Sequence, residues 1–385
     1  MSAFKYYSPK CTLFGYGCLS SLGEEILSNG YKRALVVTDK SLIQLGIAGK
    51  VTDVLEKNNI PYHIFDGVKP NPTVKNVDNG LIILKENNCD FIVSIGGGSA
   101  HDCAKAISVL AANGGRIQDY RGTDMSKKAS VPLVAVNTTA GTASECTRAY
   151  VILDEETNDK YGSRDKNVMA AIAVDDHELM MGLPKGLTAG TGMDALTHAV
   201  ECYTSINGYC LTSALALSAV KLIFKHLEGA VLNPNEEDRE GMAAGQYLAG
   251  LAFGNAGCGL VHSMSHQLSA IYDLPHGLCN AILLPEIMRF NCEDKIAQRQ
   301  YGEIANDLFP LECTGKDDSR KAGLFIEKVE ALSGKIGTKV RLISLGVKEE
   351  DIGLLADKAL KDSSLGNNPV RPTKEQVEQL FWNML

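Results

Sequence analysis

The sequence lacks the features of a disulfide-stabilised protein and of a structural zinc module. Its 11 cysteines are odd in number, are scattered along the chain and never form a CxxC pair. Disulfide frameworks and cysteine-rich zinc sites both depend on regular cysteine spacing. We therefore interpret the cysteines as reduced thiols, most of them buried as small apolar residues.

Long apolar runs and an excess of positive charge are also missing. No unbroken apolar stretch reaches the roughly 18 residues of a membrane span, and the N-terminus MSAFKYYSPKCTLFGYG has no apolar core of a signal peptide. The net charge of −8 argues against nucleic acid or an anionic membrane as the main partner. These absences predict a cytoplasmic protein that binds a small molecule, with neither nucleic acid nor membrane as partner.

What the sequence does contain is a change of pattern near its middle. A chain of 385 residues is long enough for two domains. In the first part, short apolar runs alternate with helical patterns, which predicts parallel strands joined by crossover helices. The expected strands are 34–39, 62–65, 91–95 and 131–138, with 150–153 and 170–174 beside the same sheet, and the expected helices are 41–58, 73–88 and 100–112.

After Pro184, helical patterns dominate and strand-like runs largely vanish. Helices are expected at 188–204, 211–232, 235–253, 258–272 and 277–290, with more towards the C-terminus. We therefore predict an α/β domain over residues 1–185 and an all-helical domain over residues 186–385.

A glycine-rich stretch, SIGGGSAHD at 94–102, follows one expected strand and opens the next expected helix. Glycines let the backbone approach a ligand closely, and the helix offers free N–H groups and the positive end of its dipole. The arrangement suits a diphosphate, although it is not the GxGxxG fingerprint and a plain tight turn would use the same glycines.

Two further segments could line the same site. Asp39 follows a strand, where a carboxylate can bind a ribose 2′-hydroxyl and repel a 2′-phosphate, or could simply cap the next helix. The stretch NTTAGTAS at 137–144 is a second loop of small and hydroxyl-bearing residues after a strand, or an ordinary polar loop.

Histidines gather in the helical half. His262 and His266 have i, i+4 spacing, and His276 follows an apparent helix break. Asp194 and His198 share that spacing, so each helix turns two side chains towards one face. A lone histidine is more often a core residue, but this concentration of imidazoles with one carboxylate predicts a site for Fe²⁺ or Zn²⁺. Spacing alone does not say which of the five stays outside the coordination sphere.

Together these motifs resemble those of the iron-containing (group III) alcohol dehydrogenase family. The resemblance covers nearly the whole chain, through VVTD, KPNP, GGGSAHD and NTTAGTASE in the first half and LTAGTGMDALTHAVE, LVHSMSHQL and DLPHGLCNAILLP in the second. It implies a dehydroquinate synthase-like fold, with a Rossmann-like NAD-binding domain over 1–185 and an all-helical metal-binding domain over 186–385.

The resemblance also assigns residues, carried over motif by motif. It implies NAD and one divalent metal, Fe²⁺ before Zn²⁺, with the metal ligands Asp194, His198, His262 and His276 and with His266 as a proton-relay residue beside the nicotinamide. The implied cofactor-binding residues are Asp39, Asn71, Gly96, Gly97, Gly98, Ser99, Asp102, Thr138, Thr139, Thr142 and Lys160. The expected substrate pocket comprises Arg148, Tyr150, Phe253, Cys258 and Ser364.

The implied activity is hydride transfer between the nicotinamide and a short alcohol or aldehyde, such as the 1,3-propanediol and 3-hydroxypropanal pair, in a homodimer or larger homo-oligomer. One alternative is a reductase of a small anionic aldehyde, such as sulfoacetaldehyde or succinate semialdehyde, with Arg148 as the anion partner. Another is a lyase or cyclase that uses NAD transiently and returns it unchanged. A metal-binding protein without enzymatic activity is the third.

Overall fold

The computed structural model describes residues 3–157 and 159–385. The chain divides into two compact units between Gly182 and Leu183. The boundary expected after residue 185 lies close to this division.

The first unit is built on a six-stranded sheet in which all paired neighbours are parallel. The strand order is β1-β8-β5-β4-β2-β3. The strands are β1 (Cys11–Phe14), β2 (Ala34–Val37), β3 (Tyr62–Phe65), β4 (Phe91–Gly96), β5 (Leu133–Asn137) and β8 (Ile172–Asp175). The helices are α1 (Leu22–Ser28), α2 (Lys40–Gln44), α3 (Ile47–Lys57), α4 (Val74–Glu86) and α5 (Gly98–Asn113).

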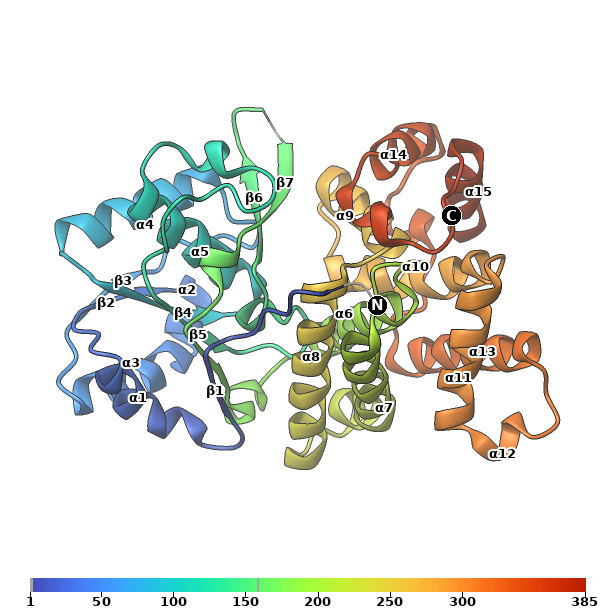
Figure 1. Ribbon diagram of the computed structural model, residues 1–385, viewed down its shortest axis with the longest axis horizontal. Helices are drawn as coiled ribbons and strands as arrows, with labels where there is room; N and C mark the ends of the chain where they lie inside the picture. The colour runs from blue at the N-terminus through green and yellow to red at the C-terminus, as the bar shows by residue number, and fades with distance from the viewer. Residues whose placement is uncertain (1–2, 158) are drawn as a thin grey trace. The chain divides into compact units, whose positions relative to one another are not determined.

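Helices cover both faces of this sheet, which is why its central strands β2, β4 and β5 are buried at every position. Leu35 and Val37 of β2 face a core shared with α4 and α5. Ala34 and Val36 face a second core shared with α1 and α3. The arrangement is visible in Figure 1, with α4 and α5 on one side of the sheet and α1 and α3 on the other. The predicted α/β fold with parallel strands is confirmed.

Two local predictions in this unit were wrong. The segment 150–153 does not join the main sheet, because β6 (Ala149–Asp154) pairs with β7 (Asp159–Arg164) in a separate antiparallel ribbon. The helix expected over 41–58 is two helices, α2 and α3. Gly46 separates them with a φ of 73°, a left-handed conformation that favours glycine.

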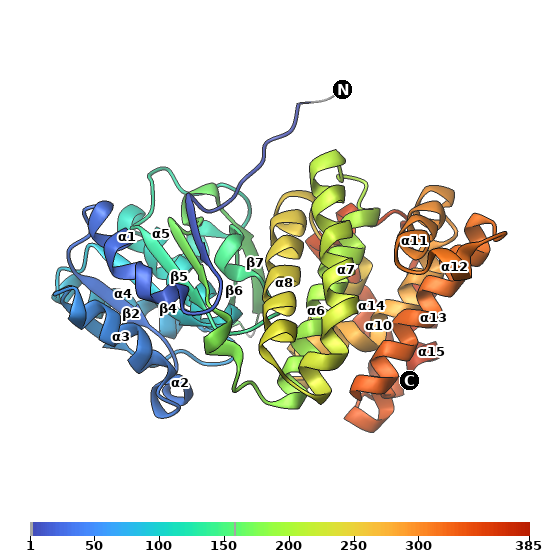
Figure 2. The ribbon, with the colours of Figure 1, turned by 90° about the horizontal axis from the view of Figure 1, so that it is seen from below.

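The second unit is entirely helical in its described residues, as predicted. Figure 2 shows its first three helices, α6, α7 and α8, side by side. The helices are α6 (Lys185–Thr204), α7 (Cys210–Leu232), α8 (Glu236–Ala256), α9 (Leu260–Tyr272), α10 (His276–Asn291), α11 (Lys295–Leu308), α12 (Pro310–Cys313), α13 (Asp318–Ile336), α14 (Ile352–Ala359) and α15 (Lys374–Met384). Most residues of α6 are buried, because α7, α8 and α10 surround it.

One helix among the described residues, α7, is long and apolar enough to cross a membrane by length and composition. The core helix of a helical bundle passes the same test, so this is weak evidence for a membrane span. One face of α7, including Ala216, Val220 and Ile223, is fully buried. The helix packs against α6 and α8.

Candidate metal centre and cofactor site

Close packing of two helices brings Asp194 and His276 together. A Cβ atom on Gly277 of α10 would lie 2.2 Å from the backbone oxygen of Gly190 on α6, so only glycine permits this approach. Gly277 directly follows His276, and Gly190 lies one turn before Asp194. The contact between α6 and α10 therefore places the two functional side chains across from each other.

Glu201 positions the third helix of the site. Its carboxylate accepts hydrogen bonds from the backbone N–H groups of Gly259 (2.8 Å) and Val261 (2.6 Å), at the N-terminus of α9. These groups have no partner within the helix, and a carboxylate there also interacts favourably with the helix dipole. The same carboxylate lies 2.6 Å from Nδ1 of His262. A proton held on Nδ1 leaves the Nε2 lone pair for a ligand.

The four residues expected to hold a metal converge on one point. Oδ1 of Asp194 lies 3.7 Å from Nε2 of His198, 3.6 Å from Nε2 of His262 and 3.6 Å from Nε2 of His276. Ligand atoms around a tetrahedral ion with bonds of about 2.1–2.2 Å lie about 3.4–3.6 Å apart. The three distances from Asp194 are close to the edges of such a tetrahedron.

The charge distribution at this point also fits a cation. Burial opposes the ionised form of Asp194, but the surrounding His198, His262 and His276 hold its pKa well below the usual range. The Nδ2 group of Asn280 lies 2.7 Å from Oδ1 of Asp194 and within 3.4 Å of two imidazole nitrogens. One amide cannot satisfy three acceptors with two protons. The residues present therefore fit a divalent ion of the Fe²⁺ or Zn²⁺ kind.

His266, the residue expected to relay protons, has a different partner. Its Nδ1 lies 2.9 Å from Oδ2 of Asp362, and its ring stacks on that of His276 with centroids 5.3 Å apart. The side chain is 34% exposed, unlike the deeply buried rings of His198 and His262. Because Asp362 engages Nδ1, Nε2 is the ring nitrogen that can face a bound molecule.

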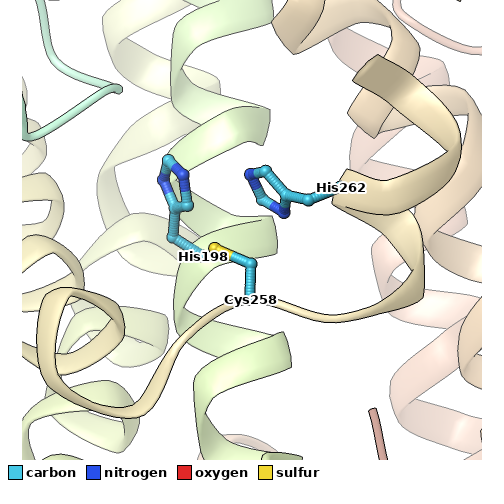
Figure 3. A group of neighbouring side chains, drawn as sticks. All are labelled: His198, Cys258 and His262. Carbon is cyan, nitrogen blue, oxygen red and sulfur yellow. The ribbon is translucent and has the colours of Figure 1, made fainter. Parts of the chain in front are cut away.

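Three of the five expected pocket residues lie around this centre. Phe253 stacks on His198 with centroids 3.9 Å apart. The backbone N–H of Ser364 donates to Asp362, the partner of His266. Cys258 lies beside the imidazoles of His198 and His262 (Figure 3).

The other two expected pocket residues, Arg148 and Tyr150, are engaged within the first unit. The Arg148 guanidinium lies 3.5 Å from Asp124 and stacks over Tyr7. Tyr150 is only 1% exposed and belongs to the core beneath β6. The structure thus gives both residues contacts within the first unit, and the side chain of Tyr150 is buried there.

The glycine loop forms a backbone cradle at the C-terminal ends of β4 and β5. Gly96 has a φ of +148°, and Cβ atoms on Gly97 and Gly98 would press against Thr139 at 2.9 Å and Thr142 at 3.2 Å. The two loops expected to line one site therefore lie against each other. Helix α5 begins within the glycine loop, and the free N–H groups of its first turn suit a diphosphate.

Further expected cofactor residues border this cradle. Lys160 donates to Oδ1 of Asn71 at 2.9 Å, and Ser99 donates to the carbonyl of Pro70, so the 69–72 segment is tied to the glycine loop. The backbone N–H of Thr138 donates to the carbonyl of Gly96 at 3.0 Å. A dinucleotide fits this arrangement, because open parallel sheets bind ligands outside the carboxyl ends of their strands.

Asp39 and Asp102 both accept hydrogen bonds from groups of the protein. Oδ1 of Asp39 caps α2 by accepting from the backbone N–H groups of Ser41 and Leu42, so the capping interpretation is realised and Oδ2 remains for a ribose. Asp102 accepts from the Ser144 hydroxyl and the Val151 backbone, at 2.8 and 2.9 Å. Asp102 therefore anchors the second loop and β6.

Comparison with known proteins agrees with this geometry. A family model described as "Iron-containing alcohol dehydrogenase" matches residues 9–177, and one described as "Fe-containing alcohol dehydrogenase family, C-terminal" matches residues 188–385. The chain therefore belongs to the iron-containing alcohol dehydrogenase family. It is an oxidoreductase of the alcohol dehydrogenase type, and the predicted family, activity class, NAD and divalent metal are confirmed at this level.

Individual relatives cover the whole chain. It is 46% identical to "Alcohol dehydrogenase 4" of Schizosaccharomyces pombe over 382 residues, 99% of this chain and 89% of the relative. It is 42% identical to "1,3-propanediol dehydrogenase" of Klebsiella pneumoniae over 382 residues, 98% of each. A crystal structure of a 1,3-propanediol oxidoreductase superposes with a TM-score of 0.97 at 41% identity and covers 100% of both chains. These relatives are dehydrogenases or oxidoreductases by name, which favours net hydride transfer over the lyase alternative.

Three residues of the centre were not predicted as functional: Glu201, Asn280 and Asp362. Glu201 lies seven residues after Asp194 and shares its helix face, and Asn280 has i, i+4 spacing from His276. Those spacings are signals in the sequence. Asp362 lies 96 residues after His266 in the sequence, and no local sequence pattern predicts that they are in contact.

Proposed function

We propose that the chain interconverts a small neutral alcohol and its aldehyde with NAD(H), with Asp194, His198, His262 and His276 as metal ligands. One observation carries the proposal: three imidazole Nε2 atoms lie 3.6–3.7 Å from a single oxygen of Asp194. A purely structural cluster of buried histidines has no need for this equal spacing.

The residues divide the work between them. A bound divalent ion would supply Lewis acidity to the substrate oxygen, and NAD would supply the hydride acceptor. Asp194 contributes the one negative charge of the ligand set, and Glu201 fixes the orientation of His262. Phe253 packs flat against His198 and shields this side of the centre from water.

His266 is the proposed proton carrier. The carboxylate of Asp362 lies against Nδ1 and fixes the tautomer of the neutral ring, so that Nε2 is the nitrogen that accepts the proton. His266 is more exposed than the buried ligands His198 and His262, so protons can pass between the ring and solvent.

Specificity for NAD over NADP is assigned to Asp39. Its cap on α2 holds the carboxylate at the carboxyl end of β2, where a 2′-phosphate would meet a fixed negative charge. Lys160 and Asn71 form a hydrogen-bonded pair, and both would bind polar groups of the cofactor.

The neutral substrate is favoured over an anionic one by the surroundings of Arg148. Its guanidinium already has Asp124 as a counter-charge and Tyr7 as a stacking partner. An incoming anion would compete with both. The relatives named after 1,3-propanediol point the same way.

NADH oxidation with a panel of short aldehydes tests the proposal. Protein reconstituted with Fe²⁺ is expected to reduce 3-hydroxypropanal faster than sulfoacetaldehyde or succinate semialdehyde. Arg148→Ala is expected to leave this ranking unchanged. A preference for an anionic aldehyde that disappears in Arg148→Ala would refute the neutral-substrate proposal and assign the arginine to the pocket.

Two further proposals concern the whole protein. All 11 cysteines are free of disulfides, which suits the reducing cytoplasm. β1 lies at the edge of the main sheet, where a strand of a second copy can pair with it, and we propose a homo-oligomer. The molar mass measured by light scattering after size-exclusion chromatography tests the proposed homo-oligomer, and the mass of a monomer would contradict it.

A further inference from the structure

Cys258 is held firmly next to the metal ligands by the glycines on either side. Gly257 ends α8 with a φ of +82°, and a Cβ atom there would lie 2.4 Å from the side chain of Asn367. A Cβ atom on Gly259 would lie 2.7 Å from Oδ1 of Asn368. Neither glycine can be replaced without displacing its neighbours, so the backbone of this short connection fixes where the thiol lies.

The thiol lies close to two imidazoles. Sγ of Cys258 and one ring nitrogen from each of His198 and His262 all lie within 4.8 Å of one another. Figure 3 shows the side chain beside both rings, at the point where the chain passes from α8 into α9. Cys258 is partly buried, and the two histidine side chains are 6% and 4% exposed. Two imidazoles and a thiol are a donor set that zinc binds readily.

We propose that His198, Cys258 and His262 form a second, sulfur-containing ligand set for a thiophilic divalent ion such as Zn²⁺. This set shares two histidines with the Asp194 set, and the inference rests on the metal centre of the proposed function. When the ion binds, a sulfur–metal bond forms and the thiol proton passes to solvent. No electron is transferred.

Because both sets use His262 and the proposed iron set also uses His198, the centre holds only one ion at a time. Thiolate ligands favour Zn²⁺, whereas imidazole with carboxylate also suits Fe²⁺. The two metals should therefore occupy different coordination spheres in the same protein. Zinc would gain a sulfur ligand, and iron would keep the nitrogen and oxygen ligands that include Asp194 and His276.

X-ray absorption at the zinc edge tests this directly. Metal-stripped full-length protein receives one equivalent of Zn²⁺, and we expect one sulfur scatterer at about 2.3 Å, beyond the nitrogen and oxygen shell at about 2.0–2.2 Å. The sulfur scatterer should be lost in Cys258→Ser. It should persist in Cys202→Ala, the matched control, which removes a buried thiol close to Cys258 on α6.

Zinc surrounded only by nitrogen and oxygen in the unmodified protein would overturn the inference and leave the proposed function intact. A sulfur scatterer that persists in Cys258→Ser would overturn it too, because another thiol would be the ligand. Failure of the unmodified protein to bind zinc or iron would refute the proposed metal centre itself.

Relative affinities give a second readout. Cys258→Ser and Cys258→Ala should both lower the affinity for Zn²⁺ and leave that for Fe²⁺ unchanged. An equal loss for both metals would mean that the residue acts only through packing. If neither variant folds, the zinc-edge spectrum of the unmodified protein decides the matter alone.

Discussion

Replacing Glu201 by Gln should loosen the metal centre without touching a ligand. The carboxylate accepts from two backbone N–H groups of α9 and faces Nδ1 of His262, with distances of 2.6–2.8 Å. Glutamine is nearly the same size but has one acceptor oxygen in place of two. Its amide group must therefore point a donor at a backbone N–H group or at the protonated ring nitrogen.

Two effects of different size follow. Loss of a carboxylate partner behind a metal-bound histidine typically costs about 10–100-fold in metal affinity, or about 1.4–2.7 kcal/mol. A buried N–H group left without an acceptor costs a further ~1–3 kcal/mol of folding stability. The Glu201→Gln protein should therefore bind Fe²⁺ and Zn²⁺ more weakly, and its metal-free form should unfold at a lower temperature.

Competition against a chromogenic chelator measures the first effect, and thermal unfolding of the stripped protein measures the second. Glu303→Gln is the matched control, because Glu303 is half exposed on α11 and its carboxylate accepts from Tyr203 rather than from a histidine. The control should match the unmodified protein in metal affinity. Unchanged metal affinity in Glu201→Gln would refute the role assigned to this carboxylate.

Three other changes have defined outcomes. Asp39→Asn keeps a capping side chain but removes its charge, so the kcat/KM ratio of NADP to NAD should rise by roughly tenfold; an unchanged ratio would exclude the carboxylate from cofactor selection. Burial and the charge of Lys105 lower the pKa of His101 to about 3 from its ordinary value of 6.5. Below pH 6.5 the unfolded chain therefore takes up a proton that the folded chain refuses, and stability should fall by about 1.4 kcal/mol per pH unit. Denaturant unfolding between pH 6.5 and pH 4.5 should show a shallower decline for His101→Gln, and equal slopes would contradict this. Asp362→Asn should lower kcat by roughly tenfold while KM stays similar, because His266 loses the carboxylate that orients its ring; a loss confined to KM would point to substrate binding instead.

The sequence predicted the main sheet well because its strands are buried on both faces. Phe91–Gly96 is mostly apolar and is buried at every position, and glycine follows at its end. β1 and β7 were missed for the opposite reason. β1 is a four-residue edge strand without a fully buried side chain, and β7, with the sequence DKYGSR, is polar.

Misplacement of the segment 150–153 has a similar cause. Its burial alternates along β6, as expected for a half-covered antiparallel ribbon rather than for a central parallel strand. An apolar stretch of this length does not reveal which strand it will pair with. The break between α2 and α3 was missed because the apolar spacing continues across Gly46.

At the candidate site, spacing along the helices identified the residues that share a face. It could not identify the carboxylates that contact the histidines from other helices. The i, i+4 spacing of Asp194 and His198 placed both side chains on one helix face, and the family resemblance named them as ligands. The interactions of Glu201 with α9 and of Asp362 with His266 depend on how separate helices pack. Such contacts are set by tertiary structure, which a single sequence shows only indirectly.

The central claim is that turnover depends on one divalent ion held by Asp194 and three histidines. The most direct test removes all metal with a chelator, returns Fe²⁺ in small steps, and follows both the bound metal and NADH oxidation with 3-hydroxypropanal. The account predicts that activity rises in proportion to bound ion and stops at one ion per chain, and that Asp194→Asn neither retains the ion nor recovers activity. Full activity in the metal-free protein would contradict the account.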